Sequence, residues 1–313
     1  MAILAWLLLA VLALTGCGEQ HKEEPAAPVS LVYNVVREWG TPGRADGAFD
    51  GVQGLTVDRE DRIYAADAEN CRVQVFDRDG RFLRAFGACG KGLGELLKPV
   101  DVAVDSAGFV YVADFLLDRI VVFDAKGNYA RQWGRTGAGE GQFSSPVGIA
   151  IDADGSVFVT GFYNHRVQKF SARGEFLTQF GHDGSGDGEL HYPGKLTTAG
   201  GSVYVADAHN SRIMKFSNTG QFEASLGFGH LYEPMDVAVD RDGRLHIADS
   251  GSRRVKLLTP QGEFVTEWNL PDQPESSFQS PASVTINSRG FLYASDIAGN
   301  RIYELELSKG EKK

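Results

Sequence analysis

Three stretches of the chain read almost alike: GFVYVADFLLDRIVVF at residues 108–123, GSVFVTGFYNHRVQKF at 155–170 and GSVYVADAHNSRIMKF at 201–216. The arginine that they share recurs along the sequence at separations of 47, 47, 46, 42 and 47 residues, as Arg72, Arg119, Arg166, Arg212, Arg254 and Arg301. A fixed period of this size is typical of a repeat architecture. The sequence therefore contains six copies of one structural unit.

Each copy is predicted to consist of strands, as the third one illustrates. Four short segments, at 146–152, 156–161, 165–171 and 176–181, are rich in apolar or alternating residues, and Gly- or Asp-containing turns separate them. Four such segments form an antiparallel meander. One meander cannot bury both of its faces, whereas six packed radially can. The fold class is thus predicted to be all-β, a six-bladed β-propeller with four antiparallel strands in each blade.

The two ends of the chain are expected to meet in the last blade. The sixth copy has only three strands, at 282–287, 291–296 and 300–307, whereas SLVYNVVREWG at 30–40 matches a fourth strand through its EWG, the counterpart of QWG at 132–134. An N-terminal strand that completes this blade would close the ring and remove an open sheet edge. The propeller is therefore expected to span 31–307, followed by a charged tail at 308–313.

Recurring side chains within the copies are predicted to be structural. Aromatic residues and one histidine recur in the second strand and are assigned to the core between blades: Tyr64, Tyr111, Phe158, Tyr204, His246 and Tyr293. A carboxylate and a guanidinium also recur, as Asp67 with Arg72 and Asp249 with Arg254. Because catalysis needs one site rather than several copies, these pairs are interpreted as ion pairs that brace turns.

The phrases FSSPVGIAID at 143–152 and ADAENCRV at 66–73 resemble the NHL repeat, and the resemblance extends over about 31–307. It implies a six-bladed propeller. Propellers of this family serve as protein- or RNA-binding platforms, as extracytoplasmic sensor domains and as scaffolds for lyases and lactonases. A shared fold does not decide among these functions.

The charge of the chain excludes some partners. Its 313 residues contain 31 Lys and Arg against 41 Asp and Glu, a net charge of −10. Such a balance argues against nucleic acid, because a phosphate backbone selects basic faces. The phosphate-binding pattern GxxxxGK[ST] is absent, which argues against a nucleotide site. The sequence also lacks CxxCH, which argues against covalent c-type haem. We expect a monomeric propeller.

The N-terminus is predicted to export and anchor the protein. MAILAWLLLAVLALTG at 1–16 carries no charged side chain and is typical of a secretory signal peptide. Leu14-Thr15-Gly16-Cys17 resembles the lipobox of bacterial lipoproteins, which implies a lipid on Cys17. Gly18 implies sorting to the outer membrane, facing the periplasm. An ordinary signal is the alternative. Residues 17–30 are polar and Pro-containing, and they are predicted to form a flexible tether.

Function is expected where the repeat is broken. Gly161 stands where other copies have Asp114 and Asp207, and the lost aspartate is predicted to release the loop that follows. Unusual side chains gather in this loop and its neighbours, and we assign a binding patch to Phe115, Leu116, Leu117, Phe162, Tyr163, His165 and Lys195. Exposed apolar patches mark interaction sites. The patch predicts a binding module for a protein, peptide or glycan; alternatively, these side chains fold onto the adjacent loop.

A metal is the basis of the alternative function. Asn164-His165-Arg166-Val167 resembles a zinc-binding histidine loop of the peptidyl-amidoglycolate lyases, which implies that His165 is a ligand. Zinc needs about three protein ligands, and His209 and His230 stand at unmatched positions. Asp101 and Asp236 begin inner strands and are candidate calcium ligands. No catalytic residue and no cofactor is predicted; a metal-dependent lyase or lactonase-like hydrolase at the channel mouth is the alternative.

Cys71 and Cys89 fall in a loop and a connection of the same copy, on the same predicted face. In an oxidising compartment two such cysteines can pair. A disulfide between them would join two loops without doing chemistry. Two free thiols are the alternative.

Overall fold

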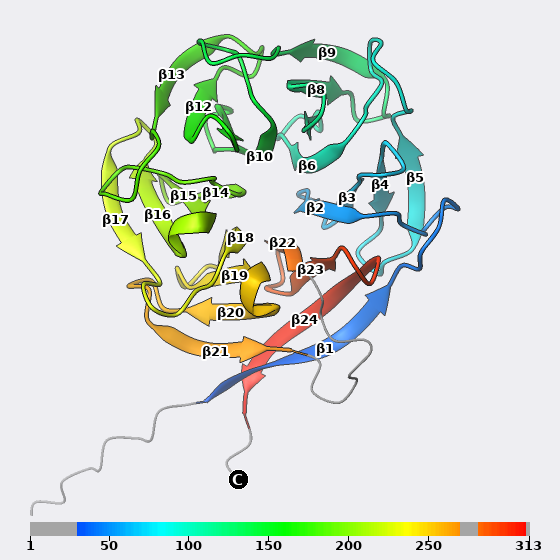
Figure 1. Cartoon of the computed structure of the whole chain (residues 1–313). Helices are drawn as coiled ribbons and strands as arrows, with labels where there is room; N and C mark the ends of the chain where they lie inside the picture. Colours follow the sequence, from blue (N-terminus) through cyan, green and yellow to red (C-terminus); the bar gives the residue numbers. More distant parts are fainter. Residues whose placement is uncertain (1–29, 270–280, 311–313) are drawn as a thin grey trace, which may run out of the picture.

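The computed structural model describes residues 30–269 and 281–310, which form six four-stranded antiparallel sheets around a central axis (Figure 1). The prediction of an all-β, six-bladed propeller is confirmed, and the described residues contain no α-helix. Within the same residues, no helix has the length and apolar character that crossing a bilayer requires. The predicted signal at 1–16, Cys17 and nearly all of the tether at 17–30 lie outside the described residues.

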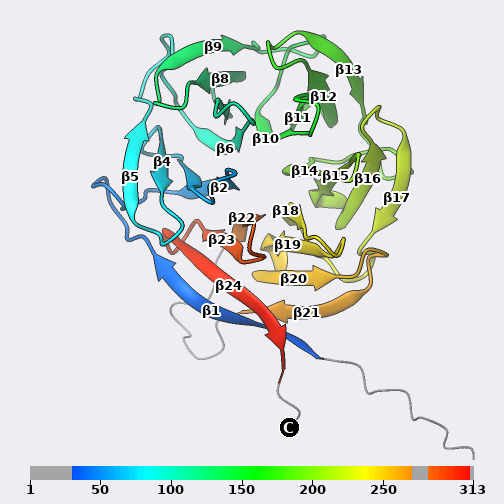
Figure 2. The ribbon, with the colours of Figure 1, turned by 180° about the vertical axis from the view of Figure 1, so that it is seen from behind.

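Blades one to three follow one another in the chain. They consist of β2 (Val52–Val57), β3 (Ile63–Asp67), β4 (Arg72–Phe76) and β5 (Phe82–Phe86); β6 (Pro99–Val104), β7 (Val110–Asp114), β8 (Arg119–Phe123) and β9 (Tyr129–Trp133); and β10 (Pro146–Ile151), β11 (Val157–Gly161), β12 (Arg166–Phe170) and β13 (Phe176–Phe180). Each blade starts at the axis and ends at the outer edge, which is also clear from behind (Figure 2).

Blades four to six repeat this order. They consist of β14 (Leu196–Ala199), β15 (Ser202–Asp207), β16 (Arg212–Ser217) and β17 (Phe222–Leu226); β18 (Pro234–Val239), β19 (Leu245–Asp249), β20 (Arg254–Leu258) and β21 (Phe264–Trp268); and β22 (Pro281–Ile286), β23 (Leu292–Asp296), β24 (Arg301–Lys309) and β1 (Leu31–Trp39). Two single turns of 3-10 helix, η1 (Ala208–Asn210) and η2 (Ser250–Ser252), lie in the loops of blades four and five.

The last blade is closed by strand β1, as predicted. It pairs antiparallel with β24, from Leu31 opposite Lys309 to Trp39 opposite Ile302 (Figure 1). The pairing reaches two residues beyond 307, into the predicted charged tail. The boundary differs because β1 supplies backbone partners for these residues, which continue the ladder irrespective of their charge.

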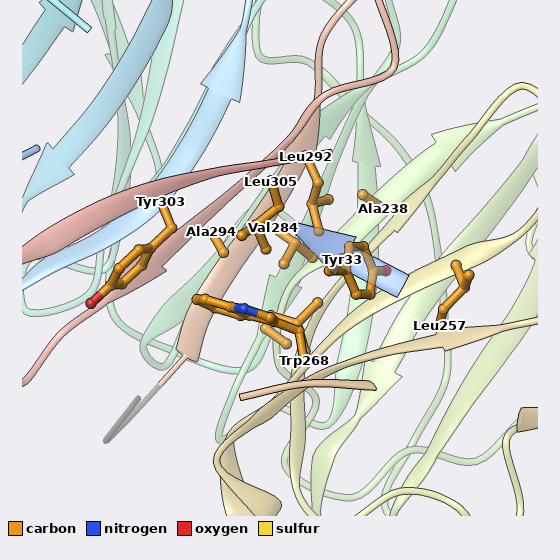
Figure 3. Close-up of a cluster of buried hydrophobic side chains, with 11 residues drawn as sticks. Tyr33, Ala238, Leu257, Trp268, Val284, Leu292, Ala294, Tyr303 and Leu305 are labelled. Carbon is orange, nitrogen blue, oxygen red and sulfur yellow. The ribbon is translucent and has the colours of Figure 1, made fainter. Parts of the chain in front are cut away.

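Hydrophobic clusters between neighbouring blades form the core. In Figure 3, Trp268 and Leu257 of blade five pack with Tyr303, Leu305 and the closing-strand residue Tyr33. The recurring second-strand positions are in the interior, as predicted: five are buried and one is partly buried, namely Tyr64, Tyr111, Phe158, His246, Tyr293 and, partly exposed, Tyr204. The radial packing therefore follows directly from the repeated apolar pattern.

Glycine in the outer turns permits close packing of successive blades. Gly174 has φ +87°, and a Cβ there would lie 2.6 Å from the ring of Trp133 in the preceding blade. A larger residue would meet both backbone strain and a steric clash. The third-to-fourth-strand turn therefore needs glycine at this position.

The recurring Asp–Arg pairs are only partly as predicted. Arg72 Nε lies 2.7 Å from Asp67, and Arg212 Nε lies 2.8 Å from Asp207, so these two pairs are confirmed. The pair predicted between Asp249 and Arg254 is wrong. The Asp249 carboxylate instead receives Lys256 Nζ at 2.7 Å, and Arg254 pairs with Glu267. Lys256 sits two residues further along the same strand and therefore faces the same side of the sheet.

Candidate functional site: an aromatic and histidine rim

One face of the propeller carries both the second-to-third-strand loops and the connections between blades. Asn70 Nδ2 in the first blade's loop donates to Gly43 O of the connection at 2.9 Å. Asn210 Nδ2 makes the equivalent bond to Gly184 O at 2.8 Å in blade four. We call the surface formed by these loops and connections the loop face.

The loop after Gly161 is held in place by a neighbouring asparagine. In blade one, Asp67 Oδ1 accepts the connection amide of Asp50 at 2.8 Å. In blade three, Asn164 Oδ1 accepts the connection amide of Ser144 at 2.6 Å. A Cβ on Gly161 would lie 2.7 Å from that same oxygen. Asn164 thus replaces the missing carboxylate and needs the space that Gly161 leaves. The loop was expected to be released, but Asn164 holds it in place.

A continuous set of rings joins the loops of three blades. Phe115 of blade two packs on Phe162 of blade three, with ring centroids 6.4 Å apart. Phe162 also contacts Tyr163 at 5.0 Å and Tyr192, in the connection to blade four, at 5.1 Å. Tyr192 in turn lies 4.6 Å from the ring of His209. We call these five residues the aromatic rim.

The aromatic rim combines buried anchors with exposed tips. Phe115 and Phe162 are partly buried, whereas Tyr163 and the adjacent Leu116 are exposed by 55% and 57%. Leu117 is partly buried. The predicted patch residues of blades two and three therefore do come together, and part of their apolar surface faces solvent.

Two histidines and an aspartate lie beside the aromatic rim, and we call His165, Asp183 and His191 the histidine clasp. Asp183 Oδ1 lies 2.7 Å from His191 Nδ1 and 3.6 Å from His165 Nδ1. The two imidazole rings are stacked, with centroids 5.4 Å apart and planes 15° apart. His165 Nδ1 also accepts the backbone N–H of Tyr192 at 3.0 Å. One atom from each clasp residue lies within 4.8 Å of the others, close enough to hold a metal ion.

The local environment sets the charge of the histidine clasp. The hydrogen bond from His191 lowers the pKa of the Asp183 carboxyl, which favours the carboxylate. Burial lowers the pKa of His165, although Asp183 acts in the opposite direction. A neutral imidazole and a carboxylate are both forms that bind metal ions.

The structure places Lys195 elsewhere. Its side chain is 3% exposed and does not join the aromatic rim. Its Nζ lies near the axis, 3.7 Å from Asp101 Oδ1. Burial raises the pKa of Asp101 to about 7 and also raises that of Asp236, while Lys195 lowers both. Asp101 and Asp236 are the two candidate calcium ligands. Lys195 therefore gives them the positive charge that a calcium ion would otherwise supply.

The two carboxylates also brace neighbouring blades. Asp101 Oδ2 accepts the amide of Ile149 at 2.8 Å, and Asp236 Oδ2 accepts the hydroxyl of Ser283 at 2.7 Å. The central channel that they line has a volume of about 260 Å³, and its walls are the inner strands of all six blades. The channel wall thus holds a compact polar network that links blades two and five to their successors.

Cys71 and Cys89 form a disulfide on the loop face, with Cα atoms 5.0 Å apart. It joins the blade-one loop to the connection that leaves that blade. His165 and Asp183 occupy the same two positions in blade three.

Sequence reasoning missed three residues of this region: Asp183, His191 and Tyr192. A signal was present, because His191-Tyr192 directly precedes Pro193, at the point where other copies have Leu97-Lys98 and Ser144-Ser145. His209 does reach the aromatic rim, whereas His230 packs near Phe264, with ring centroids 6.0 Å apart.

Comparisons with known proteins agree with the repeat and the fold. Residues 52–124 match the family model described as a 6-bladed beta-propeller, and residues 143–170 match the NHL repeat model. A segment of 69 residues is 38% identical to Protein brain tumor of Drosophila melanogaster, which is 22% of this chain and 6% of that protein. The chain thus spans only about 6% of the length of this curated relative.

Solved propellers are similar over most of the chain. The streptogramin B lyase structure is 17% identical with a TM-score of 0.63, over 89% of this chain and 98% of that chain. A structural-genomics protein from Bacteroides thetaiotaomicron is 18% identical with a TM-score of 0.68, over 89% of this chain and 77% of that chain. At this level of identity the likeness shows a common fold.

Proposed function

Since this chain is a six-bladed propeller with an NHL repeat, we propose that it is a binding module whose aromatic rim captures a polypeptide partner. The observation that carries the proposal is the exposure of Tyr163 and Leu116 on top of partly buried rings from two blades. Aromatic side chains are enriched at protein interfaces and dominate their binding energy.

The loop face supports such an interface because hydrogen bonds hold the backbone of the two loops that carry Phe115 and Phe162. Phe162 N–H donates to Ser145 O at 2.9 Å, and Phe115 N–H donates to Lys98 O at 2.9 Å. Both loops are therefore ordered before a partner arrives, which lowers the entropic cost of binding.

The packing of the rings favours a polypeptide over a glycan. Phe162 and Tyr163 meet edge to face at 89°, and Tyr192 covers Phe162 from another direction. A sugar ring would need a free aromatic face on which to stack, whereas a polypeptide side chain fits between tilted rings.

Photocrosslinking tests this function. A photoreactive amino acid at position 116 or 163 should give a discrete protein adduct in an extract of the source cells, and excess unlabelled protein should suppress it. The matched control is position 177 on strand β13, because Leu177 is 52% exposed and lies away from the loop face. Adducts that form equally at position 177, or that excess protein does not suppress, would contradict the proposal.

The double variant Leu116→Glu with Tyr163→Glu should weaken binding of the crosslinked partner by at least about 100-fold, because it places two charges in a desolvated apolar contact. Leu177→Glu should leave the affinity unchanged. Both replaced side chains are more than half exposed, so unfolding is not expected, and circular dichroism provides the check.

We propose further that a lipid on Cys17 anchors this module to the bacterial outer membrane. The propeller then faces the periplasm. The Leu14-Thr15-Gly16-Cys17 motif supports this location, and an oxidising compartment suits the Cys71–Cys89 disulfide. Metabolic labelling with a palmitate analogue should mark the wild-type protein and leave Cys17→Ser unmarked. Equal labelling of the two would refute the anchor.

A metal-dependent lyase or hydrolase is the second candidate function. The histidine clasp favours it, because two imidazoles and a carboxylate are ligands that catalytic zinc uses while a fourth position stays open for water. Turnover of lactone or lyase substrates that is lost with chelator and in His191→Ala would establish this function. If a chelator abolishes turnover but leaves partner capture unchanged, the enzymatic function and the binding function are separate.

A further inference from the structure

Two residues of the histidine clasp, His165 and Asp183, occupy positions that are directly bonded to each other in blades one and two. The residue before the recurring arginine adopts a left-handed backbone, with φ 53° at Cys71, 50° at Asp118 and 53° at His165. Its counterpart is the third residue of the following connection, which forms a parallel bridge to a later residue of that connection in each case: Cys89 to Leu96, Thr136 to Phe143 and Asp183 to Leu190. Both positions therefore have the same backbone geometry in the three blades.

The chemistry of the cross-link differs between the blades. In blade one it is the Cys71–Cys89 disulfide, and in blade two Thr136 Oγ1 donates to Asp118 Oδ2 at 2.5 Å. In blade three the pair is His165 and Asp183, whose nearest ligand atoms are 3.6 Å apart. This separation is too long for a hydrogen bond, so the blade-three pair is the one without a direct bond.

His191 adds a third ligand atom at this gap. Its Nδ1 lies 2.7 Å from Asp183 Oδ1, and its ring stacks on that of His165. A tetrahedral zinc ion about 2.0–2.2 Å from each ligand separates the ligand atoms by roughly 3.3 Å. The observed separations of 2.7 and 3.6 Å lie on either side of this value.

We propose that His165, Asp183 and His191 bind a divalent transition-metal ion, with zinc as the best match, which joins the blade-three loop to the connection into blade four. Two imidazoles disfavour calcium and magnesium, which prefer oxygen ligands throughout. The proposed site lies on one blade and its connection, and none of its three ligands lines the central channel. The inference concerns metal binding itself and does not rest on the proposed partner.

Metal binding replaces two existing hydrogen bonds. Both imidazoles ligate through Nδ1, so the Tyr192 N–H leaves His165 and the proton between His191 and Asp183 is released or moves to Nε2. One coordination position faces solvent, because the side chains of Asp183 and His191 are 63% and 39% exposed. His209 is the nearest other imidazole, 5.6 Å from His191 between ring centroids.

Titration calorimetry with zinc chloride tests the site. The tag-free full chain, treated with chelator and kept in mild detergent, should bind zinc saturably at one equivalent. His191→Ala should weaken this binding by at least about 100-fold. The matched control is His182→Ala, because His182 is adjacent to Asp183 and lies outside the clasp. Absence of saturable binding, or equal losses in the two variants, would overturn the proposal.

Thermal unfolding provides an independent readout. Zinc in excess should raise the Tm of the wild type and of His182→Ala but not that of Asp183→Asn, because a ligand that binds the folded state stabilises it. Asp183 is exposed, so its replacement should preserve the fold, whereas His165 also accepts a backbone amide and is unsuitable as the main variant. A zinc-induced rise in Asp183→Asn as large as in the wild type would place the ion elsewhere. Failure of partner capture would leave these results unaffected.

Discussion

The phenol of Tyr33 lies 2.7 Å from Nδ1 of His246, and this hydrogen bond ties the closing strand β1 to blade five. His246 Nε2 faces the Asp240 carboxylate at 3.2 Å. Because a carboxylate only accepts, Nε2 carries the proton and Nδ1 accepts from Tyr33. In blade one, Tyr64 occupies the equivalent position and donates to Asp58 at 3.1 Å. His246 thus makes the same bond to an aspartate that Tyr64 makes, and its second ring nitrogen accepts a hydrogen bond from Tyr33 of the closing strand.

The difference in unfolding free energy between the wild type and His246→Gln should grow as the pH rises from 5 to 7.5. Burial lowers the pKa of His246 against the opposing effect of Asp240, and Arg244 lowers it further. The unfolded histidine binds a proton near its ordinary pKa, so the neutral folded form loses stability as the pH falls below about 6.5. Urea titrations at three pH values measure this, and a pH-independent difference would contradict it.

Replacing Lys195 by Met should destabilise the propeller by about 3–5 kcal/mol at pH 8, because two buried carboxylates then lack their cation. The loss should be smaller at pH 5. Burial raises the pKa of Asp101 to about 7 even with Lys195 present, so at pH 5 this carboxyl is mostly neutral. Chemical denaturation at both pH values measures the difference. The double variant Lys195→Met with Asp101→Asn should regain part of the stability at pH 8, and no recovery would refute the charge argument.

Removal of the disulfide in Cys71→Ser with Cys89→Ser should lower the unfolding free energy by about 3 kcal/mol, as expected for a loop of this length. Reductant should reduce the stability of the wild type to that of the variant and leave the variant unchanged. Urea unfolding with and without reductant measures both effects. If the reduced and oxidised wild type were equally stable, the bond would make no contribution.

Tyr33→Ala should cost about 3–5 kcal/mol, because it empties a buried aromatic site between Trp268 and Leu305 and removes the partner of His246. Val36→Ala on the same strand is the control. Val36 is exposed, so its replacement should change the stability by less than about 0.5 kcal/mol. Differential scanning calorimetry of the two variants provides the comparison, and similar Tm values would argue against ring closure through Tyr33.

Some of the pairings within one blade could be predicted from the sequence. The Asp67–Arg72 pair was predictable because both residues recur at one spacing on adjacent strands. The pair expected for Asp249 was wrong because Lys256 presents a second cation to the same carboxylate, and spacing alone does not rank two cations. The role of Asn164 was likewise hidden, because it depends on the space that Gly161 leaves.

The amino-acid sequence by itself determined the six blades and their closure, because strand alternation, turn glycines and the period of the recurring arginine are properties of neighbouring residues. Only the tertiary structure decided that Lys195 joins Asp101 near the axis, and that Asp183 and His191 meet His165 on the loop face. These contacts depend on the path of each connection across the loop face and on the left-handed backbone at His165. Such geometry arises from packing between blades, and the period of the repeat does not predict that packing.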